Sequence, residues 1–449
     1  MTDRALFEPA VSSQRWRGTP PSHWPLKRLK WSISGLYNGI WGDEPDGEND
    51  ILCIRVADFD RVRRSVVSEP PTIRSVDFGY RDQRLLRKGD LLIEKSGGGD
   101  NQLVGCVVHF NHDFEAVCSN FVARIPLRGG MVPQYWNYVH SSLYSARLNF
   151  PAVKQTTGIQ NLDAESYFDI EVAFPPAQEQ SVIADFLDRE TARIDGLIAE
   201  KERMLALLEE KRAALISRVV TRGLNPNAPL KPSGQEWLGE IPAHWEVQPI
   251  KYLAVVGNGS TPSIENADYW DDKGYPWLNS SVVNVTPVMN ASRFVTETAL
   301  RECHLPKVQP PAVLVGITGQ GKTRGMASLL GIEATINQHL AYIKPRTREL
   351  DTEYLCHLLA HAYAFLRSDS DGAGSTKGAI TCEQLANMKI PVPALDEQVE
   401  ICGRIRQSLD VSEPLLVEIK RSLELLAERR TALITSGVTG QIPLEEMTG

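Results

Sequence analysis

The sequence has no run of about 18 apolar residues, and acidic Asp3 and Glu8 lie where a secretory signal would have a basic start. We therefore expect a cytoplasmic protein. The seven cysteines are scattered and form no Cys-x-x-Cys pair, which argues for buried thiols and against a zinc ribbon or a disulfide framework. The formal net charge of -8 argues against a general polyanion binder, so any DNA-binding face must be local.

Catalytic motifs are missing as well. The chain has no Asn- or Asp-Pro-Pro-aromatic tetrapeptide of the kind with which amino-methyltransferases bind a flipped base, and Asn149-Phe150-Pro151 does not replace it. Asp90, Glu94 and Lys95 resemble a metal-dependent nuclease site only faintly, because no residue separates Glu94 from Lys95. We expect no catalytic residue, no bound metal and no cofactor in this chain.

A chain of 449 residues exceeds the roughly 250 to 300 residues of a single core, so two or more domains are expected. The sequence contains an internal repeat, in which the second half resembles the first at an offset of about 220 residues. Pro21-Ser22-His23-Trp24 matches Pro242-Ala243-His244-Trp245, and Glu179-Gln180 matches Glu397-Gln398. Between these anchors, Leu91-Leu92-Ile93 and Val313-Leu314-Val315 each lead to a Gly-rich turn and another apolar run, the pattern of a hairpin.

Each half ends in a long helical pattern. Apolar residues recur at steps of three, four or seven residues and are surrounded by charged residues, which is typical of a coiled coil; an isolated surface helix is the alternative. The pairing stripe comprises Leu187, Ile194, Ile198, Leu205, Leu208 and Leu215 in the first half and Ile405, Ser412, Leu416, Leu423, Leu426 and Leu433 in the second. Gly223 and Pro226 end the first helix.

Gly316-Ile317-Thr318-Gly319-Gln320-Gly321-Lys322-Thr323 satisfies the phosphate-binding pattern of a P-loop ATPase. A P-loop should begin a helix, whereas Gly325 and the apolar residues after it indicate a return strand. The first half has Ser96-Gly97-Gly98-Gly99-Asp100-Asn101 at the same place, without the Lys and hydroxyl that contact phosphate and magnesium. We therefore favour a basic turn that presents Lys322 and Arg324 to DNA phosphates.

His23 and His244 lie beside Trp in Pro-rich turns, and we interpret them as structural.

The run from Lys231 to Trp245, together with the helix-ending segments Arg212-Ala213-Ala214-Leu215-Ile216 and Arg430-Thr431-Ala432-Leu433-Ile434, resembles the specificity subunits of type I restriction-modification systems. The resemblance covers nearly the whole chain. The first half keeps only Pro21, His23 and Trp24 of the long run.

This resemblance implies an α+β protein with a pseudo-two-fold internal repeat, in which two strand-rich target recognition domains are held apart by two antiparallel helices. The expected limits are an extension at 1–18, a first target recognition domain at 19–173, a central helix at 174–222, a linker at 223–239, a second domain at 240–393, a C-terminal helix at 394–437 and a tail at 438–449. Each domain would read one half of a split, asymmetric site on double-stranded DNA. The helices would set the gap and bind two methyltransferase subunits, with motor-nuclease subunits as further partners. S-adenosylmethionine, ATP and Mg²⁺ would belong to those partners.

Base and phosphate contacts require polar and basic side chains on loops and strands. The candidates are Lys95, Asn101, Lys154, Gln155 and Thr157 in the first half, and Lys322, Thr323, Arg324, Ser375, Thr376 and Lys377 in the second. Two other functions remain open: a DNA-binding coiled-coil scaffold without methyltransferase partners, and a P-loop ATPase.

Overall fold

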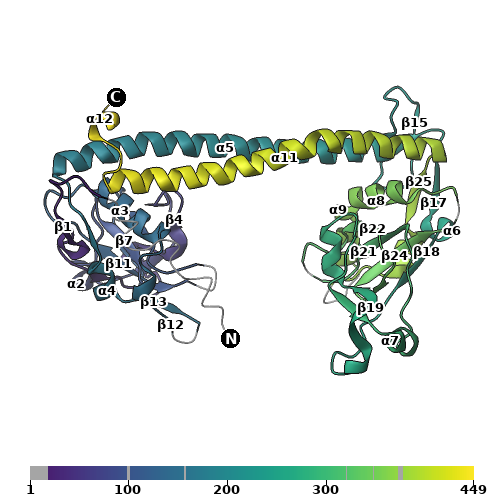
Figure 1. The fold of residues 1–449 in the computed structure, drawn as a ribbon, viewed down its shortest axis with the longest axis horizontal. Coiled ribbons are helices and arrows are strands. Elements are labelled where there is room, and N and C mark those ends of the chain that lie inside the picture. The colour runs from purple at the N-terminus through teal and green to yellow at the C-terminus, as the bar shows by residue number, and fades with distance from the viewer. Residues whose placement is uncertain are drawn as a thin grey trace. The chain divides into compact units, whose positions relative to one another are not determined.

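The computed structural model describes residues 19–98, 102–155, 158–319, 321–346, 348–372 and 378–448. The chain forms two compact units (Figure 1), and each is described by itself. Unit 1 comprises Met1–Glu202 with Arg421–Gly449, and unit 2 comprises Arg203–Lys420. Each unit therefore combines one sheet-based domain with a part of each of the two long helices.

Unit 1 is built on a six-stranded sheet. Its strand order is β2 (Tyr37–Asn38), β11 (Val122–Ile125), β7 (Leu91–Glu94), β9 (Val107–His109), β5 (Ser65–Val66) and β4 (Phe59–Asp60). Successive side chains of a strand point to opposite faces. Leu91 and Ile93 accordingly pack with α3 (Pro133–Ser145), while Leu92 packs on the other face with Phe110. Both faces are covered, which is why these strands are continuous apolar runs.

Smaller elements complete unit 1. The strand β3 (Asp50–Ile54) pairs in parallel with β10 (Ala116–Cys118) and antiparallel with β6 (Ile73–Ser75). Another sheet has the order β12 (Val153–Gln155), β13 (Gln160–Leu162) and β8 (Ser96–Gly97). The strand β1 (Leu26–Arg28) pairs with β14 (Glu171–Ala173). Short helices are α2 (Phe78–Arg81), α4 (Ala164–Phe168), η2 (Leu29–Trp31), η3 (Val56–Asp58) and η4 (Phe150–Ala152).

Unit 2 has a central sheet of the order β18 (Ala254–Asn258), β24 (Leu340–Pro345), β21 (Ala312–Gly316) and β22 (Ala327–Leu330). A second sheet has the order β20 (Arg293–Val295), β19 (Trp270–Leu278) and β23 (Thr335–Ile336). Two pairs are β17 (Glu246–Pro249) with β25 (Lys389–Val392) and β15 (Leu230–Pro232) with β16 (Glu240–Pro242). The helices are α6 (Ile250–Leu253), α7 (Glu297–Glu302), α8 (Thr352–His361), α9 (Tyr363–Gly372), α10 (Cys382–Asn387), η5 (Ala267–Tyr269) and η6 (Ser280–Asn284).

The strand register confirms the internal repeat. In unit 1, β7 lies between β11 and β9, and in unit 2, β21 lies between β24 and β22, with every pair antiparallel. Glu94 pairs with Val122, and at the same place Gly316 pairs with Leu340. The predicted hairpins around the Gly-rich turns are therefore β7–β9 and β21–β22. The strands of the two hairpins occupy equivalent positions in their sheets.

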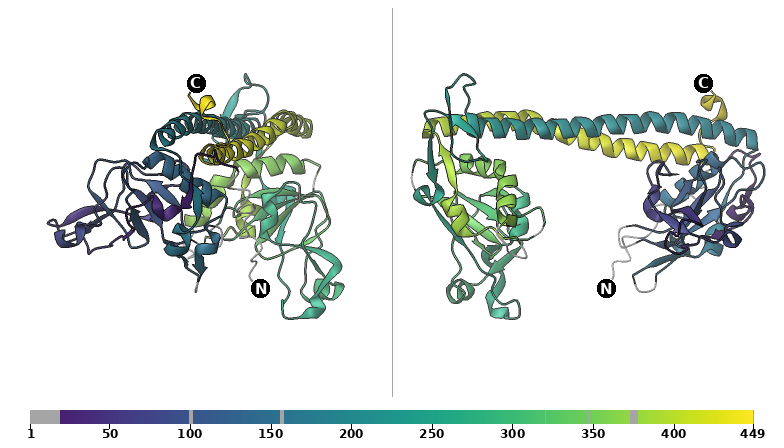
Figure 2. Two further views of the ribbon diagram at one scale, coloured as in Figure 1. Left: turned by 60° about the vertical axis from the view of Figure 1, so that its left-hand side comes forward. Right: turned by 180° about the vertical axis from the view of Figure 1, so that it is seen from behind.

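Two long helices, α5 (Ala177–Arg222) and α11 (Leu395–Val438), pack together in each unit (Figures 1 and 2). In unit 1, Leu187 lies beside Gly437, and Asp195 bonds Arg430. In unit 2, Arg212 pairs with Glu413. The helix direction is antiparallel, as predicted.

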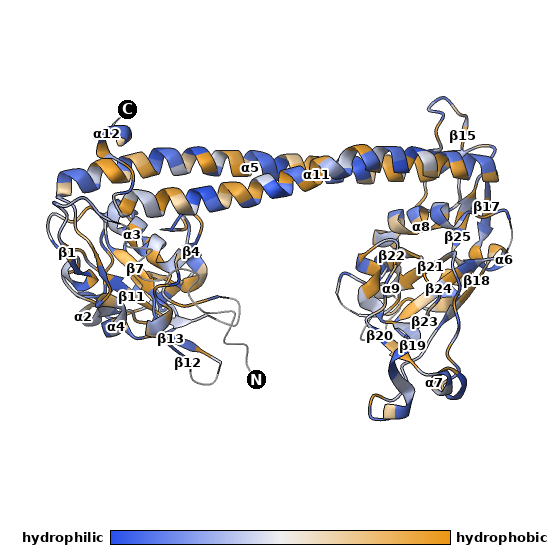
Figure 3. Ribbon diagram, in the orientation of Figure 1, coloured by the Kyte–Doolittle hydropathy of each residue, from blue (hydrophilic) through white to orange (hydrophobic). Residues whose placement is uncertain are grey.

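Figure 3 shows apolar and polar residues alternating along both long helices, as an amphipathic pattern requires. Every predicted stripe residue is buried or half-buried, from Leu187 in α5 to Leu433 in α11, whereas most residues between them are exposed. An isolated surface helix is therefore excluded. The fold class is α+β, with two strand-rich domains and two long antiparallel helices that pack together.

The observed helix limits lie close to the predicted 174–222 and 394–437. Residues 223–239, predicted to be a linker, contain β15, which forms a pair with β16. The predicted tail contains α12 (Leu444–Met447), whose Met447 is buried in the core of unit 1. The predicted extension 1–18 lies outside the described residues. Among the described helices, none is both long and apolar enough to cross a membrane.

Candidate nucleic-acid interface

The first repeated motif anchors a long helix in unit 1. Trp24 Nε1 donates to Glu179 Oε2 at 2.6 Å, and His23 Nε2 lies 2.9 Å from Glu179 Oε1. Glu179 is in the first turn of α5. The hydroxyl of Tyr135, in α3, donates to the carbonyl of Val438 at the end of α11. One domain thus contacts the start of one long helix and the end of the other.

Unit 2 repeats these contacts. Trp245 Nε1 donates to Glu397 Oε2 at 3.0 Å, and His244 Nε2 lies 3.0 Å from the same oxygen. The hydroxyl of Tyr354, in α8, lies 3.3 Å from the carbonyl of Val220 near the end of α5. We call each of these contact sets a helix joint. His23 and His244 belong to the joints, which agrees with their interpretation as structural residues.

The glutamine that follows each joint glutamate also has the same role in both units. Gln180 Nε2 donates to the Pro175 carbonyl at 2.9 Å, and Gln398 Nε2 donates to the Pro393 carbonyl at 2.8 Å. A glycine of positive φ follows each long helix, Gly223 (φ 68°) and Gly440 (φ 72°), as in a C-terminal cap. A Cβ on Gly440 would lie 2.9 Å from the Trp24 ring, so this close approach also requires glycine.

The structure places three of the predicted DNA-binding residues of the first half. Lys95 follows β7 and is half-buried, and its Nζ donates to Asn38 Oδ1 at 2.8 Å. Lys154 and Gln155 are exposed on β12, and Lys154 Nζ lies 2.7 Å from Asp163 Oδ2. These segments are neighbours, because β12 pairs with β13, and β13 pairs with β8 just after Lys95. Asn101 and Thr157 lie outside the described residues.

In the second half, Lys322 is exposed and Thr323 is half-buried. The expectation that Arg324 is presented to solvent is wrong, because its side chain is only 4% exposed. Ser375, Thr376 and Lys377 lie outside the described residues.

The P-loop interpretation is not supported by the structure of this turn. Residues 322–325 form a turn, and the chain returns as β22 antiparallel to β21. A P-loop needs a helix N-terminus at this place to bind phosphate. The carbonyl of Gly321 instead accepts a hydrogen bond from Arg367 Nη1 at 2.7 Å, and that of Lys322 accepts one from the Tyr363 hydroxyl. The turn is attached to α9 and exposes the Lys322 side chain.

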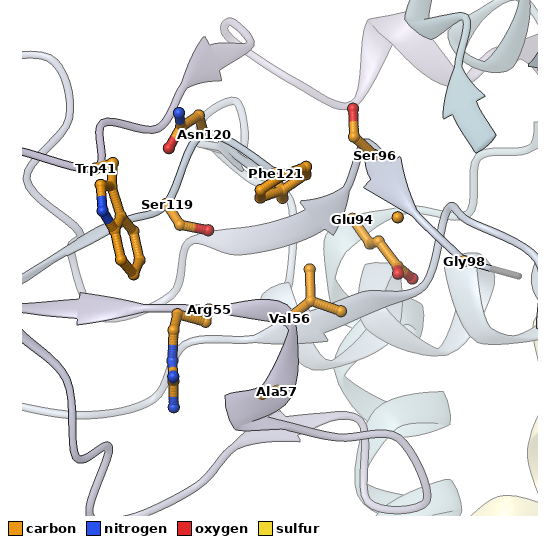
Figure 4. A pocket seen from close by; sticks show the side chains of 11 residues that line it. Trp41, Arg55, Val56, Ala57, Glu94, Ser96, Gly98, Ser119, Asn120 and Phe121 are labelled. Atoms are coloured by element: carbon orange, nitrogen blue, oxygen red, sulfur yellow. The ribbon is translucent and has the colours of Figure 1, made fainter. Parts of the chain in front are cut away.

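A pocket of about 470 Å³ opens in unit 1 where β7 and β11 meet. Trp41, Val56 and Phe121 form much of its apolar wall, and Asn120 and Glu94 add polar atoms (Figure 4). The Glu94 carboxylate is 1% exposed and accepts a hydrogen bond from Arg61 Nη2 at 2.9 Å. Burial raises the pKa of Glu94, and the neighbouring Arg61 guanidinium opposes that shift. An apolar pocket with a few fixed polar groups is suited to a planar, partly polar ligand group.

The predicted residue set included none of these pocket residues. Asn120 and Phe121 lie in a short turn between two buried strands, β10 and β11, and carry no basic charge. Comparison of the two halves would have drawn attention to them, since Val122-Ala123 and Leu340-Ala341 align while the residues before them differ.

All seven cysteines are free, and five of them are buried. Burial raises the pKa of the Cys118 thiol to about 12, so this thiol stays protonated at neutral pH. In the described ranges, no group of three or more His, Cys, Asp or Glu side chains is arranged to hold a metal ion.

Residues 242–421 match the family model of the type I restriction modification DNA specificity domain. The chain is 21% identical to the putative type I restriction enzyme MjaX specificity subunit of Methanocaldococcus jannaschii, over 95% of both chains. It is 23% identical to the EcoR124I/EcoR124II specificity subunit of Escherichia coli, over 55% of both chains.

Solved structures agree in fold. A chain from a study of complex assembly and conformational transition in the type I R-M system matches with a TM-score of 0.70 and 16% identity, over 95% of this chain and 100% of that chain. The HsdS subunit of Thermoanaerobacter tengcongensis matches with a TM-score of 0.50 and 16% identity, over 94% of this chain and 98% of that one. The family-model match and the curated relatives both indicate a type I restriction-modification specificity subunit, and the solved structures share the fold of the chain.

Proposed function

We propose that the chain is the DNA-reading subunit of a type I restriction-modification complex, in which each half reads one part of a bipartite, asymmetric site. The observation that carries this proposal is the repetition of one sheet and one helix joint with different side chains at matching positions. Equal joints attach the two domains to the long helices in the same way. Unlike side chains on a common scaffold are what two different half-sites require.

DNA backbone contacts would come from the basic residues near the Gly-rich turns. Lys322 is exposed on its turn. Lys154 pairs with Asp163, but its side chain is 72% exposed, and an exposed ion pair of this kind contributes little to stability because water screens it. Lys154 can therefore exchange Asp163 for a phosphate at little cost. The overall charge of -8 would confine DNA to these local surfaces.

Docking of a methyltransferase subunit is supported by a groove between the long helices within unit 2. The groove has a volume of about 620 Å³ and includes the basic residues Lys211, Arg218 and Arg404. Val411 and Leu415 also line it and are 75% and 43% exposed. Apolar side chains with a basic rim fit an acidic, amphipathic segment of a protein partner.

The chemistry would belong to the partners. Two methyltransferase subunits would bind S-adenosylmethionine and methylate adenine N6, and motor-nuclease subunits would use ATP and Mg²⁺. The chain itself would recognise the DNA target site and would supply no catalytic residue. Its cytoplasmic location, expected from the sequence, stays a prediction.

Methylation-aware sequencing tests this proposal. The chain would be expressed with its matching methyltransferase subunit, and methylated adenines would be mapped on DNA. We expect a bipartite site, one half of which changes when residues 19–173 are replaced by the same domain of a relative. Methyl transfer by the purified chain alone would contradict the proposal, as would methylation without a bipartite site.

The docking groove has its own test. Val411→Asp should reduce copurification of the methyltransferase subunit, because a buried carboxylate would face apolar partner atoms. Val62→Asp, a change at another exposed valine (63% exposed, in unit 1), is the matched control and should leave copurification unchanged. Equal losses in both variants, or none in either, would remove the groove from the proposal.

A further inference from the structure

A tight turn between β10 and β11 is fixed by backbone hydrogen bonds in unit 1. The amide of Val122 donates to the carbonyl of Ser119 at 2.9 Å, which closes the turn. The amide of Ser119 donates to the Ile54 carbonyl, and the amide of Lys95 donates to the Phe121 carbonyl, both at 2.9 Å. The turn is thus joined to β3 and to the segment after β7.

Unit 2 contains the same turn between β23 and β24. The amide of Leu340 donates to the Asn337 carbonyl at 3.3 Å. The amide of Asn337 donates to the Leu278 carbonyl, and the amide of Ile317 donates to the His339 carbonyl, both at 2.9 Å. Each of these three bonds of the first turn therefore has a counterpart in the second. We call Ser119–Val122 and Asn337–Leu340 the presenting turns.

Burial follows the same order in both turns. The first residue is buried, with Ser119 2% and Asn337 4% exposed, and the last residue begins a buried strand. The two middle residues are exposed: Asn120 and Phe121 in one turn, Gln338 and His339 in the other. The backbone is held alike while the presented side chains differ in size and polarity.

The second turn presents oriented polar groups. Gln338 Oε1 accepts from the Thr261 hydroxyl at 2.6 Å, and His339 Nδ1 shares a hydrogen bond with the Thr318 hydroxyl. These bonds restrict both side chains before any ligand arrives. A glutamine amide pairs with N6 and N7 of adenine in the major groove.

The first turn presents an apolar surface. Phe121 is 50% exposed and lines the 470 Å³ pocket together with Trp41 and Val56 (Figure 4). An apolar side chain in a groove of DNA contacts the C5-methyl group of thymine. The adjacent Asn120 adds hydrogen-bonding atoms at the same rim.

We propose that the presenting turns are specificity-determining elements, with Phe121 reading a thymine methyl group in one half-site and Gln338 reading an adenine in the other. This proposal rests on the proposed function, since it assigns residues to the same DNA interface. The scaffold sets the position of each contact, and the two middle residues select the base.

The test uses the complete complex of this chain with its methyltransferase subunits and a DNA library randomised in both half-sites. Phe121→Ala should reduce discrimination at one position of one half-site by about 10-fold or more, and Gln338→Ala should do so in the other half-site. The gap should stay the same. Trp31→Ala, at an aromatic residue that is 51% exposed on η2, and Gln248→Ala, on β17, are matched controls that should leave both half-sites unchanged.

The outcomes separate the two proposals. If the unchanged complex methylates a bipartite site and neither Phe121→Ala nor Gln338→Ala alters it, the presenting turns do not select bases. A change of both half-sites by one variant would also overturn the assignment, provided that thermal unfolding is unchanged. Methylation with no sequence preference in the unchanged complex would overturn the proposed function and the turn assignment with it.

Discussion

Two equivalent ion pairs between the long helices provide an internal comparison of geometry and energy. In unit 1, Arg430 Nε and Nη2 donate to the two carboxylate oxygens of Asp195 at 2.7 and 3.1 Å. In unit 2, the equivalent pair is a single, longer contact, in which Arg212 Nη1 lies 3.8 Å from Glu413 Oε2. The first pair is 14% and 27% exposed, the second 39% and 62%.

We expect unequal coupling energies from these geometries. A bidentate, partly buried guanidinium–carboxylate pair should contribute about 1–2 kcal/mol, and a single exposed contact about 0–0.5 kcal/mol. Alanine substitution of each residue singly and of both together gives the coupling in each unit. Native-state hydrogen exchange of α11 amides measures the opening free energy close to each pair, which avoids treating two units as one unfolding transition.

The two cycles are controls for each other, because both use the same pair of helices. Coupling of equal size in the two units would refute the argument from distance and burial. So would a value below about 0.5 kcal/mol for Asp195 with Arg430, since it would place a bidentate pair in the range of exposed contacts.

Three further predictions concern the joints, the basic turn and a buried histidine. Glu397→Ala should destabilise unit 2 by about 1–3 kcal/mol, because it removes the acceptor of the buried Trp245 indole, while Glu397→Gln should cost less; native-state hydrogen exchange of unit 2 amides measures both. Lys322→Ala should weaken DNA binding and lower its salt dependence by about one counterion, whereas loss of tight ATP binding in calorimetry would point to an ATPase. Burial lowers the pKa of His140 to about 3 from its usual 6.5, so the unfolded chain takes up this proton at higher pH. Stability from the neutral ring should be complete above pH 6.5 and decline as pH falls toward 3, and His140→Gln should flatten that decline in urea unfolding; an unchanged pH profile would contradict it.

The repeat made much of the fold predictable. Apolar residues that recur with a period of about 3.5 predicted the two long helices and their pairing, because an amphipathic stripe must be buried against a partner. The Pro-x-His-Trp and Glu-Gln anchors could be matched in the sequence, but their contact could not, since Trp24 and Glu179 are joined across a whole folded domain. An internal repeat shows which residues recur in both halves, but it does not show which residues they contact.

The candidate DNA surface was less predictable. Arg324 was expected to be exposed because it follows Lys322 in a basic, Gly-rich segment, yet the turn directs it inward and leaves it 4% exposed. The sequence-based choice favoured polar and basic residues in and near the Gly-rich turns, so it did not include Phe121, which is apolar, or Gln338, which precedes a different strand. Their exposure depends on strand register and on turn closure, which are set by backbone bonds to distant segments.

The parts of the helix pair α5–α11 in unit 1 and in unit 2 differ in a way that bears on partner binding. Ile194 is 5% exposed in unit 1, whereas its counterpart Ser412 has a short polar side chain that lies 3.3 Å from the Leu409 carbonyl and lines the groove of unit 2. A serine there leaves the space that an isoleucine would fill, and the neighbouring Val411 stays 75% exposed. If the groove had no occupant, closing it with an apolar residue would stabilise the helix pair through burial. Ser412 is a polar residue in the apolar stripe, and Val411 is an exposed aliphatic residue beside it. Together they favour a groove that binds another chain over an imperfectly packed copy of the repeat.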